Sequence, residues 1–511
     1  TIETARLRRA SLVYSVKSRI LENVDSKKVM LLVTSAGSRR DVEIASYLQD
    51  LGKRVLSVQP SDLAAEQCAK YAGSVSGVGP VQCWLLPNKQ VKPESEVVFT
   101  SARHFFHEFM RREPALSDFQ AIVIDGLQED SAYQKVILNI LRRHYVSRVG
   151  LVLCSNKSNV CASIQEAFGL ETQDIVQCVV KFPVEVVWKG KPTNRVNACV
   201  SAALEFCLKA KDSGGDVLVF LPSMADAFRA DALLDHKLNG KEMEVEISHE
   251  VLFGCMSSTF SNGQPPVGCW RVIFAAECPD AIVGMMHVRC VIDSGLMLRT
   301  VYRSGAMVMR LAYVSEAEAE ERRALAGIHD CGTCYRLYSR DACVSSPPVD
   351  ISESRFLEDI LLRLSARQTS SDASYLGSVP KKLLKDVKRA LQEIGTLDHD
   401  GRLTDLGEKI CQTTLEPRLG KLVLGSVGRA PSLDAILLSI LAFEDLLAAY
   451  SQLKKDGTER SIPASDADSV FSRVIELYKN WFIVPKKMKS TWCELNGVNE
   501  AFINRLHSAA Q

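Results

Sequence analysis

Up to residue 178, short apolar runs of the chain alternate with segments in which apolar residues recur at helical spacing. The runs are rich in Val, Ile and Leu on consecutive positions, which is typical of parallel strands buried on both faces. They occupy residues 29–33, 54–58, 96–100, 121–124 and 150–154. Helical patterns, such as 41–51 and 62–71, lie between several of them. This alternation predicts a doubly wound α/β domain.

The pattern predicts three further units. A second set of strand-like runs, at residues 216–221, 270–275 and 289–293, indicates another α/β domain. After a Ser-Ser-Pro-Pro linker at 345–348, the apolar spacing becomes helical. The exception lies at 397–403, where an Asp-Gly turn predicts a small hairpin, so this unit suits a winged-helix module. From Ser432 onward the spacing is helical throughout.

Composition narrows the class of protein. The 511 residues are 46% hydrophobic and 24% charged, as in globular domains, and the net charge of +1 excludes a strongly basic footprint over the whole chain. Only Cys331 and Cys334 among the 16 cysteines form a CxxC pair, so we expect reduced thiols in the cytoplasm or nucleus and no zinc site. No apolar run reaches the roughly 18 residues that span a bilayer, and we expect no membrane contact.

A turn that contains Gly37 follows the first predicted strand, at the position where an α/β domain binds phosphate. The turn reads Thr-Ser-Ala-Gly-Ser-Arg-Arg-Asp over residues 34–41, and it resembles the first motif of the DEAH-box RNA helicases, GETGSGKT. Further similar segments follow in the family's order over nearly the whole chain. They include 59–65, 124–131, 155–157, 182–186, 218–221, 291–295, 334–338, 397–407 and 417–421.

The resemblance implies two tandem RecA-like domains followed by a winged-helix domain and a helical-bundle, ratchet-like domain. The expected boundaries are 1–178, 179–343, 344–430 and 431–511. Because the chain begins with Thr1 and lacks the family's further domain after the bundle, we expect it to be part of a larger protein.

The residues that the resemblance places at the chemical positions differ from the family's. In the first motif, Thr34 and Arg39 replace glycines, Arg40 replaces the phosphate-binding Lys, and Asp41 replaces the hydroxyl that holds Mg²⁺, whereas Gly37 and Ser38 are retained. In the DEAH motif Asp125 remains, but Gly126, Leu127 and Gln128 replace Glu, Ala and His. Gly126 has no side chain that can act as a base. In the last helicase motif Arg322 remains, but Leu325 and Ile328 replace the two arginines that face the γ-phosphate.

These substitutions predict a catalytically inactive pseudo-helicase that is not an enzyme, has no catalytic residue, and binds no nucleotide cofactor or metal. We expect a structural scaffold or protein-interaction platform, with other protein domains or subunits as partners. One alternative is a nucleotide-independent RNA-binding module, and a third is a divergent active NTPase or helicase. The RNA-binding candidates form one basic run and are Lys381, Lys382, Lys385, Lys388 and Arg389.

Two histidines, His104 and His107, lie one helical turn apart. Because no third ligand is evident nearby in the sequence, we expect a structural role for them and not a metal site.

Overall fold

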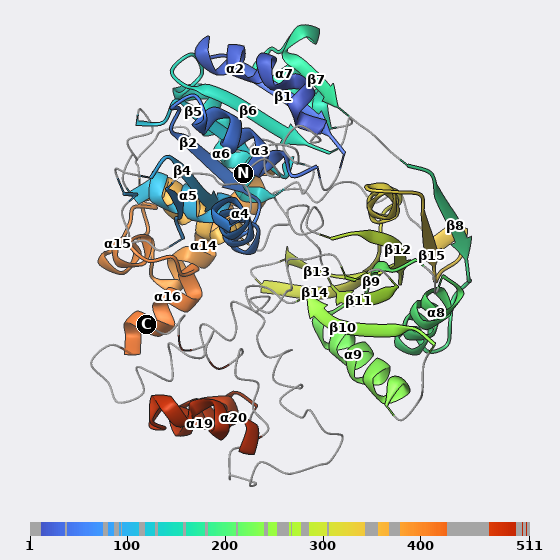
Figure 1. The fold of residues 1–511 in the computed structure, drawn as a ribbon. Helices are drawn as coiled ribbons and strands as arrows, with labels where there is room; N and C mark the ends of the chain where they lie inside the picture. Colours follow the sequence, from blue (N-terminus) through green and yellow to red (C-terminus); the bar gives the residue numbers. More distant parts are fainter. Residues whose placement is uncertain are drawn as a thin grey trace.

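The computed structural model of the protein is shown in Figure 1. It describes residues 12–35, 38–74, 80–85, 91–92, 95–111, 118–127, 131–156, 160–178, 182–210, 213–239, 244–252, 265–266, 268–276, 286–303, 306–342, 356–366, 379–426 and 470–496, together with Ile503 and His507. Gly37 and Gln128, two of the expected motif residues, lie outside this part.

The first unit contains a seven-stranded parallel sheet in the order β3-β4-β2-β5-β6-β1-β7. Its strands are β1 (Val29–Thr34), β2 (Val55–Gln59), β3 (Val81–Cys83), β4 (Val97–Ser101), β5 (Ala121–Ile124), β6 (Gly150–Ser155) and β7 (Ile175–Cys178). Its helices are η1 (Leu12–Val16), α2 (Lys17–Asp25), α3 (Arg40–Gln49), α4 (Asp62–Ser74), α5 (Ala102–Arg111), α6 (Ala132–His144), α7 (Val160–Phe168) and η4 (Thr172–Asp174).

Both faces of this sheet are covered, as the continuous apolar runs predict. Successive residues of a strand point to opposite faces, so Leu31 packs in one apolar cluster and its neighbour Leu32 in another, and both are fully buried. The five predicted strands of this unit are confirmed. The short strand β3 and the final strand β7 were not predicted.

The second unit contains a six-stranded parallel sheet in the order β10-β11-β9-β12-β15-β8. Its strands are β8 (Val184–Trp188), β9 (Gly215–Phe220), β10 (Glu246–Leu252), β11 (Cys269–Ala275), β12 (Val288–Asp293) and β15 (Gly332–Arg336). An antiparallel pair, β13 (Leu296–Arg303) and β14 (Ala306–Tyr313), follows β12. The helices are α8 (Arg195–Lys209), α9 (Met224–Leu238), α11 (Glu316–Ala324), η6 (Leu325–Gly327) and η7 (Arg340–Ala342).

The third described segment is helical and packs on the first unit (Figure 1). Its helices are α12 (Leu357–Ala366), α14 (Lys381–Ile394), α15 (Asp405–Cys411) and α16 (Pro417–Ser426). An antiparallel bridge joins Leu397 to Leu403 around a turn in which Gly401 has a φ of 81°, so the predicted Asp-Gly turn is present. The ring of Tyr133 in α6 lies tilted against that of Phe356, which directly precedes α12, with 4.9 Å between the centroids. One apolar cluster runs from the first sheet into this segment.

Beyond residue 426 the structure describes α19 (Val470–Phe482), η9 (Lys486–Met488) and α20 (Lys489–Leu495). These elements agree with the helical pattern there, whereas most of the range 431–511 lies outside the described residues. The two parallel sheets fall within the ranges 1–178 and 179–343, and the domain boundaries themselves stay predictions.

Candidate functional site

The candidate site lies where β1 and β5 end and α3 begins. Thr34 is the last residue of β1, Arg40 is the first residue of α3, and Asp125 directly follows β5. Carboxyl ends of neighbouring parallel strands meet at one edge of a sheet, which is where α/β folds bind phosphate groups. The fold therefore brings together Thr34 and Arg40, which the sequence assigned to the phosphate turn, and Asp125, which it assigned to the DEAH motif.

Arg40 and Asp125 form a buried ion pair at this edge. Nε of Arg40 lies 2.6 Å from Oδ1 of Asp125, and the two side chains are 2% and 4% exposed. Nη1 of Arg40 also donates to Oγ1 of Thr34 at 2.9 Å. Hydrogen bonds to charged groups are short and strong at such low exposure. The guanidinium that replaces the family's lysine is thus bound to the retained aspartate.

Two hydroxyl groups extend this network. Oγ of Ser38 lies 2.8 Å from Oγ1 of Thr34, in hydrogen-bonding distance. Arg39, which follows Ser38 and directly precedes α3, has a left-handed φ of 53°. Glycine, which the family has at this position, adopts that conformation more readily. Its guanidinium hydrogen-bonds to the hydroxyl of Tyr71 and lies over that ring, 5.6 Å from the centroid, so it is directed toward α4.

Asp41 places a second carboxylate beside this pair. It lies in the first turn of α3 with 3% exposure, and Sγ of Cys68 donates to its Oδ2 at 2.7 Å. Burial, and then the negative charge of Asp125, raise the pKa of Asp41 to about 6. The site therefore carries two acidic groups around one arginine.

The position at which the family resemblance places the catalytic glutamate is closed by the local backbone conformation and by the ring of Pro60. Gly126 has a φ of 73°, and a Cβ atom there would lie 2.7 Å from Cγ of Pro60. Leu127, the next residue, is 4% exposed and packs in the core of the first unit. Any side chain at position 126 thus meets both an unfavourable backbone conformation and Pro60.

The residues expected at the arginine-finger positions are part of the packing of the second unit. Leu325 is 6% exposed, and Ile328 packs against the same apolar cluster. The retained Arg322 donates from Nη1 to Oδ1 of Asp293 at 2.6 Å and lies 4.6 Å from the ring centroid of Phe220. Arg322 therefore contributes to the buried polar contacts of the second unit.

The five basic candidates lie on one face of α14. The buried residues of the opposite face are Val387, Ala390, Leu391 and Ile394. Lys381, Lys382, Lys385, Lys388 and Arg389 are all exposed, as is Glu393 near the end of the helix. Arg389 has an acidic neighbour, Asp386, at 3.9 Å, and within the described part of the chain no acidic side chain forms an ion pair with the four lysines.

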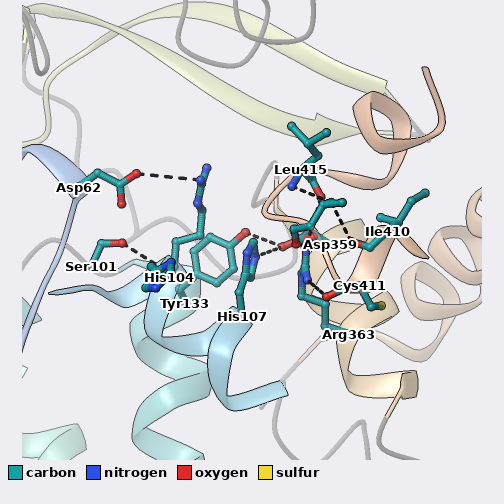
Figure 2. Close-up of polar contacts among 12 residues, drawn as sticks. Asp62, Ser101, His104, His107, Tyr133, Asp359, Arg363, Ile410, Cys411 and Leu415 are labelled. Atoms are coloured by element: carbon teal, nitrogen blue, oxygen red, sulfur yellow. Dashed lines mark hydrogen bonds and ion pairs between the residues drawn. The ribbon is translucent and has the colours of Figure 1, made fainter. Parts of the chain in front are cut away.

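A second polar cluster, which the sequence did not predict, joins the first unit to α12 (Figure 2). Asp359 accepts hydrogen bonds from Nε2 of His107 at 2.7 Å, from the hydroxyl of Tyr133 at 2.8 Å and from Nε of Arg363 at 2.9 Å. The other nitrogens of Arg363 donate to the carbonyl oxygens of Cys411, Thr413 and Leu415. His107 therefore has a structural role, as expected.

The charges in this cluster are strongly perturbed. Burial, and then the charge of Arg363, lower the pKa of His107 to about 4, so the ring is neutral at pH 7. Burial alone would raise the pKa of Asp359, but Arg363 and the hydrogen bonds from His107 and Tyr133 hold it below its ordinary value. His104 beside it packs edge-on against Trp84 at 5.1 Å, and burial lowers its pKa to about 3.

No group of His, Cys, Asp and Glu side chains suited to a metal ion occurs among the described residues. Cys331 is exposed and Cys334 is buried, and each described cysteine is a free thiol. Of the helices that can be described, none has the length and apolar character needed to cross a membrane.

The fold and the site define an α/β chain with two RecA-like units, and in the first unit the Arg40–Asp125 pair lies where β1 and β5 end and α3 begins. No family model matches the chain. The ATP-dependent RNA helicase DEAH12, chloroplastic, of Arabidopsis thaliana is 24% identical over 542 residues, which cover 98% of the chain and 30% of that protein. The probable ATP-dependent RNA helicase DHX34 of Mus musculus is 24% identical over 526 residues, covering 96% of the chain and 45% of that relative.

A solved structure agrees with these relatives. The DEAH/RHA helicase HrpB of Escherichia coli superposes with a TM-score of 0.71 at 20% identity, over 85% of this chain and 57% of that one. The chain is therefore similar to DEAH-box RNA helicases over nearly its whole length, and its parallel sheets follow the fold of HrpB. It spans less than half the length of these two curated relatives.

These comparisons contradict one expectation from the sequence, that the chain is not an enzyme. The relatives with which it aligns over 96% and 98% of its residues are named ATP-dependent RNA helicases, which points to an enzyme. The expectation relied on the residues found at the motif positions. Residue identities alone do not determine whether a divergent site is catalytically active.

The arrangement at β1, β5 and α3 does not fit a magnesium nucleotide as it stands. The guanidinium of Arg40 is bound to Asp125 and Thr34, and the acidic group of Asp41 lies where the family has a hydroxyl. We therefore derive no step of hydrolysis from this geometry.

Proposed function

We propose that the chain is the core of a divergent DEAH-type RNA helicase and that it binds RNA within a larger protein. In this proposal residues 344–430 form a winged-helix domain and residues 431–511 belong to a ratchet-like helical bundle. The exposed basic face of α14 is the observation that carries RNA binding, and the relatives' names support the substrate class. The free thiols of the described cysteines fit a reducing compartment, the cytoplasm or nucleus.

The basic face has the chemistry that a phosphate backbone requires. Lysines that form no ion pair with acidic side chains of the described residues gain favourable interactions by replacing the counterions around phosphates, and the gain decreases with salt. The apolar face of α14, which includes Val387 and Leu391, is packed inside its unit, so the helix presents the charges in a fixed orientation. We expect contact with the backbone and no reading of base identity.

The test compares two triple variants with equal changes in charge. Lys381→Glu/Lys382→Glu/Lys385→Glu changes α14, whereas Lys27→Glu/Lys28→Glu/Lys209→Glu changes three exposed lysines elsewhere. The α14 variant should bind single-stranded RNA at least about tenfold more weakly, and its log–log salt slope should fall by about 2, since each phosphate contact contributes roughly 0.7. The control should bind nearly as the wild type does. Equal losses in both variants would show that α14 has no special role.

A second candidate function is a scaffold or protein-interaction platform within a larger protein. The packing of Leu325 and Ile328 into the second unit favours it. These residues stand where arginine fingers are expected, and they contribute to the folded core. RNA binding separates the two candidates. Absence of measurable binding at low salt would remove the first candidate and leave the scaffold, and RNA-stimulated ATP hydrolysis would support the first.

A further inference from the structure

We propose that the Arg40–Asp125 ion pair is an autoinhibitory latch, in which Asp125 holds the guanidinium that a nucleotide's phosphates need. Phosphate then binds only when the pair separates. The inference rests on the proposed function for the assignment of this edge to nucleotide phosphates. It adds a regulatory contact at that site which the family resemblance does not supply.

The fold fixes both partners of the latch. Asp125 is held at its backbone, because its N–H donates to the carbonyl of Val58 at 2.9 Å and its carbonyl accepts from Nε2 of Gln134 at 2.7 Å. Arg40 is held by the start of α3 and by Thr34. These contacts hold both residues in the positions that the pair requires, so the paired state is preorganised.

Burial strengthens the pair. Arg40 is 2% exposed and Asp125 is 3% exposed, so water does not weaken their attraction as it does at a surface. Removing one partner of a buried pair leaves an uncompensated charge, which is strongly unfavourable. An anion that reaches Arg40 must therefore offset the loss of Asp125, and phosphate is an anion of suitable charge and geometry.

Asp41 reinforces the latch against anions. Its carboxyl group lies close enough to Asp125 to be affected by its charge, and it also interacts with Cys68 of α4, with Arg40 and with the backbone of Val42. With Asp41 ionised, the two acids outnumber the one arginine. If Asp125 were neutral, Asp41 would remain as a second partner for Arg40, so both acids must be considered in a test.

The test measures binding of pyrophosphate and of ATP in EDTA to the full chain by calorimetry. Asp125→Asn should bind both at least about tenfold more tightly than the wild type, and Asp41→Asn/Asp125→Asn more tightly still. Asp41→Asn alone should have a smaller effect, because the latch remains. The matched control is Asp293→Asn, which breaks the buried Arg322–Asp293 pair at the same 2.6 Å separation in the second unit. It should lose stability without gaining affinity.

A milder variant covers the case in which Asp125→Asn does not fold. Arg40→Lys keeps both charges, but an ammonium does not reproduce the planar hydrogen bonds to Asp125 and Thr34. It should bind pyrophosphate severalfold more tightly. The proposal of a latch would be overturned if no folded variant bound pyrophosphate more tightly than the wild type. It would also be overturned if the gain in affinity were equal to that of Asp293→Asn. Neither result bears on RNA binding by α14, and the lysine variants do not affect the latch, so the two proposals fail separately.

Discussion

Nε2 of His107 lies 2.7 Å from Oδ2 of Asp359, although the two residues are 252 positions apart in the chain. His107 lies on α5 of the first unit and Asp359 on α12, and both are buried (Figure 2). The same carboxylate binds Tyr133 and Arg363. One acidic group thus connects the first α/β unit to the helical segment that follows the second.

Substitution of Asp359 should be the most destabilising change in this cluster. Asp359→Asn removes the charge partner of the buried Arg363, and we expect a loss of about 3–5 kcal/mol, as for other broken buried pairs. Tyr133→Phe removes one hydrogen bond and should cost about 1–2 kcal/mol. The free energy of unfolding from urea titration gives both values. In the double variant the losses should be less than additive, and strict additivity would contradict a direct contact.

The neighbouring histidines should make the protein sensitive to acid. His107 has a folded pKa of about 4, below the ordinary 6.5, so its neutral form contributes stability above pH 6.5 that is lost as the pH falls toward 4. The full loss is about 3 kcal/mol. His107→Gln, which donates a hydrogen bond but does not titrate, should flatten stability between pH 6.5 and 4. His104 titrates in the same direction, with a folded pKa of about 3, so His104→Gln should add to the flattening. An unchanged pH profile in both variants would refute this origin.

The sequence predicts the centres of the sheets well and their edges poorly. Runs such as 121–124 lie in the middle of a sheet, are apolar on consecutive positions and are easily recognised. The edge strands β8 and β10 are only partly buried, and their mixed polarity gives a weaker pattern. Such an edge strand can be recognised only when the elements that cover one of its faces are known.

The candidate site was predicted as a set of positions, but its contacts were not. The family motifs locate Arg40 and Asp125, yet the ion pair between them joins residues 85 positions apart and depends on the strand order. Gly126 was recognised as a missing base, whereas its positive φ and its closeness to Pro60 are visible only in three dimensions. Residue identities therefore indicated which catalytic groups are missing, and the structure shows which side chains lie at those positions instead.

Neutralising Asp41 should stabilise the protein, with the opposite pH dependence from the histidines. Its folded pKa of about 6 exceeds the ordinary 3.8, so the ionised form is disfavoured and stability falls as the pH rises from about 4 to 6. Asp41→Asn should raise the free energy of unfolding by about 1–3 kcal/mol at pH 7.5, with no gain near pH 4. Asp405→Asn, at an exposed position in the first turn of α15, is the control and should lose a few tenths of a kcal/mol.

Restoring a side chain at Gly126 should be destabilising because of Pro60. Gly126→Ala combines a left-handed φ of 73° with a Cβ atom 2.7 Å from Cγ of Pro60, and we expect a loss of about 2–4 kcal/mol. Gly52→Ala is the matched control, since Gly52 has a φ of 67° but no heavy atom within 4 Å of an added Cβ. It should lose only about 1 kcal/mol.

A second substitution separates the contact at Gly126 from its backbone conformation. Pro60→Ala should recover part of the loss in Gly126→Ala, because it removes the ring atom that the new Cβ would meet, and it should recover nothing in Gly52→Ala. Thermal unfolding of the two glycine variants, of Pro60→Ala and of the two double variants measures this coupling. Equal losses at the two glycines, with no recovery, would mean that the backbone conformation alone disfavours a side chain at 126. Recovery would instead identify Pro60 as the residue that keeps the position of the family's glutamate closed.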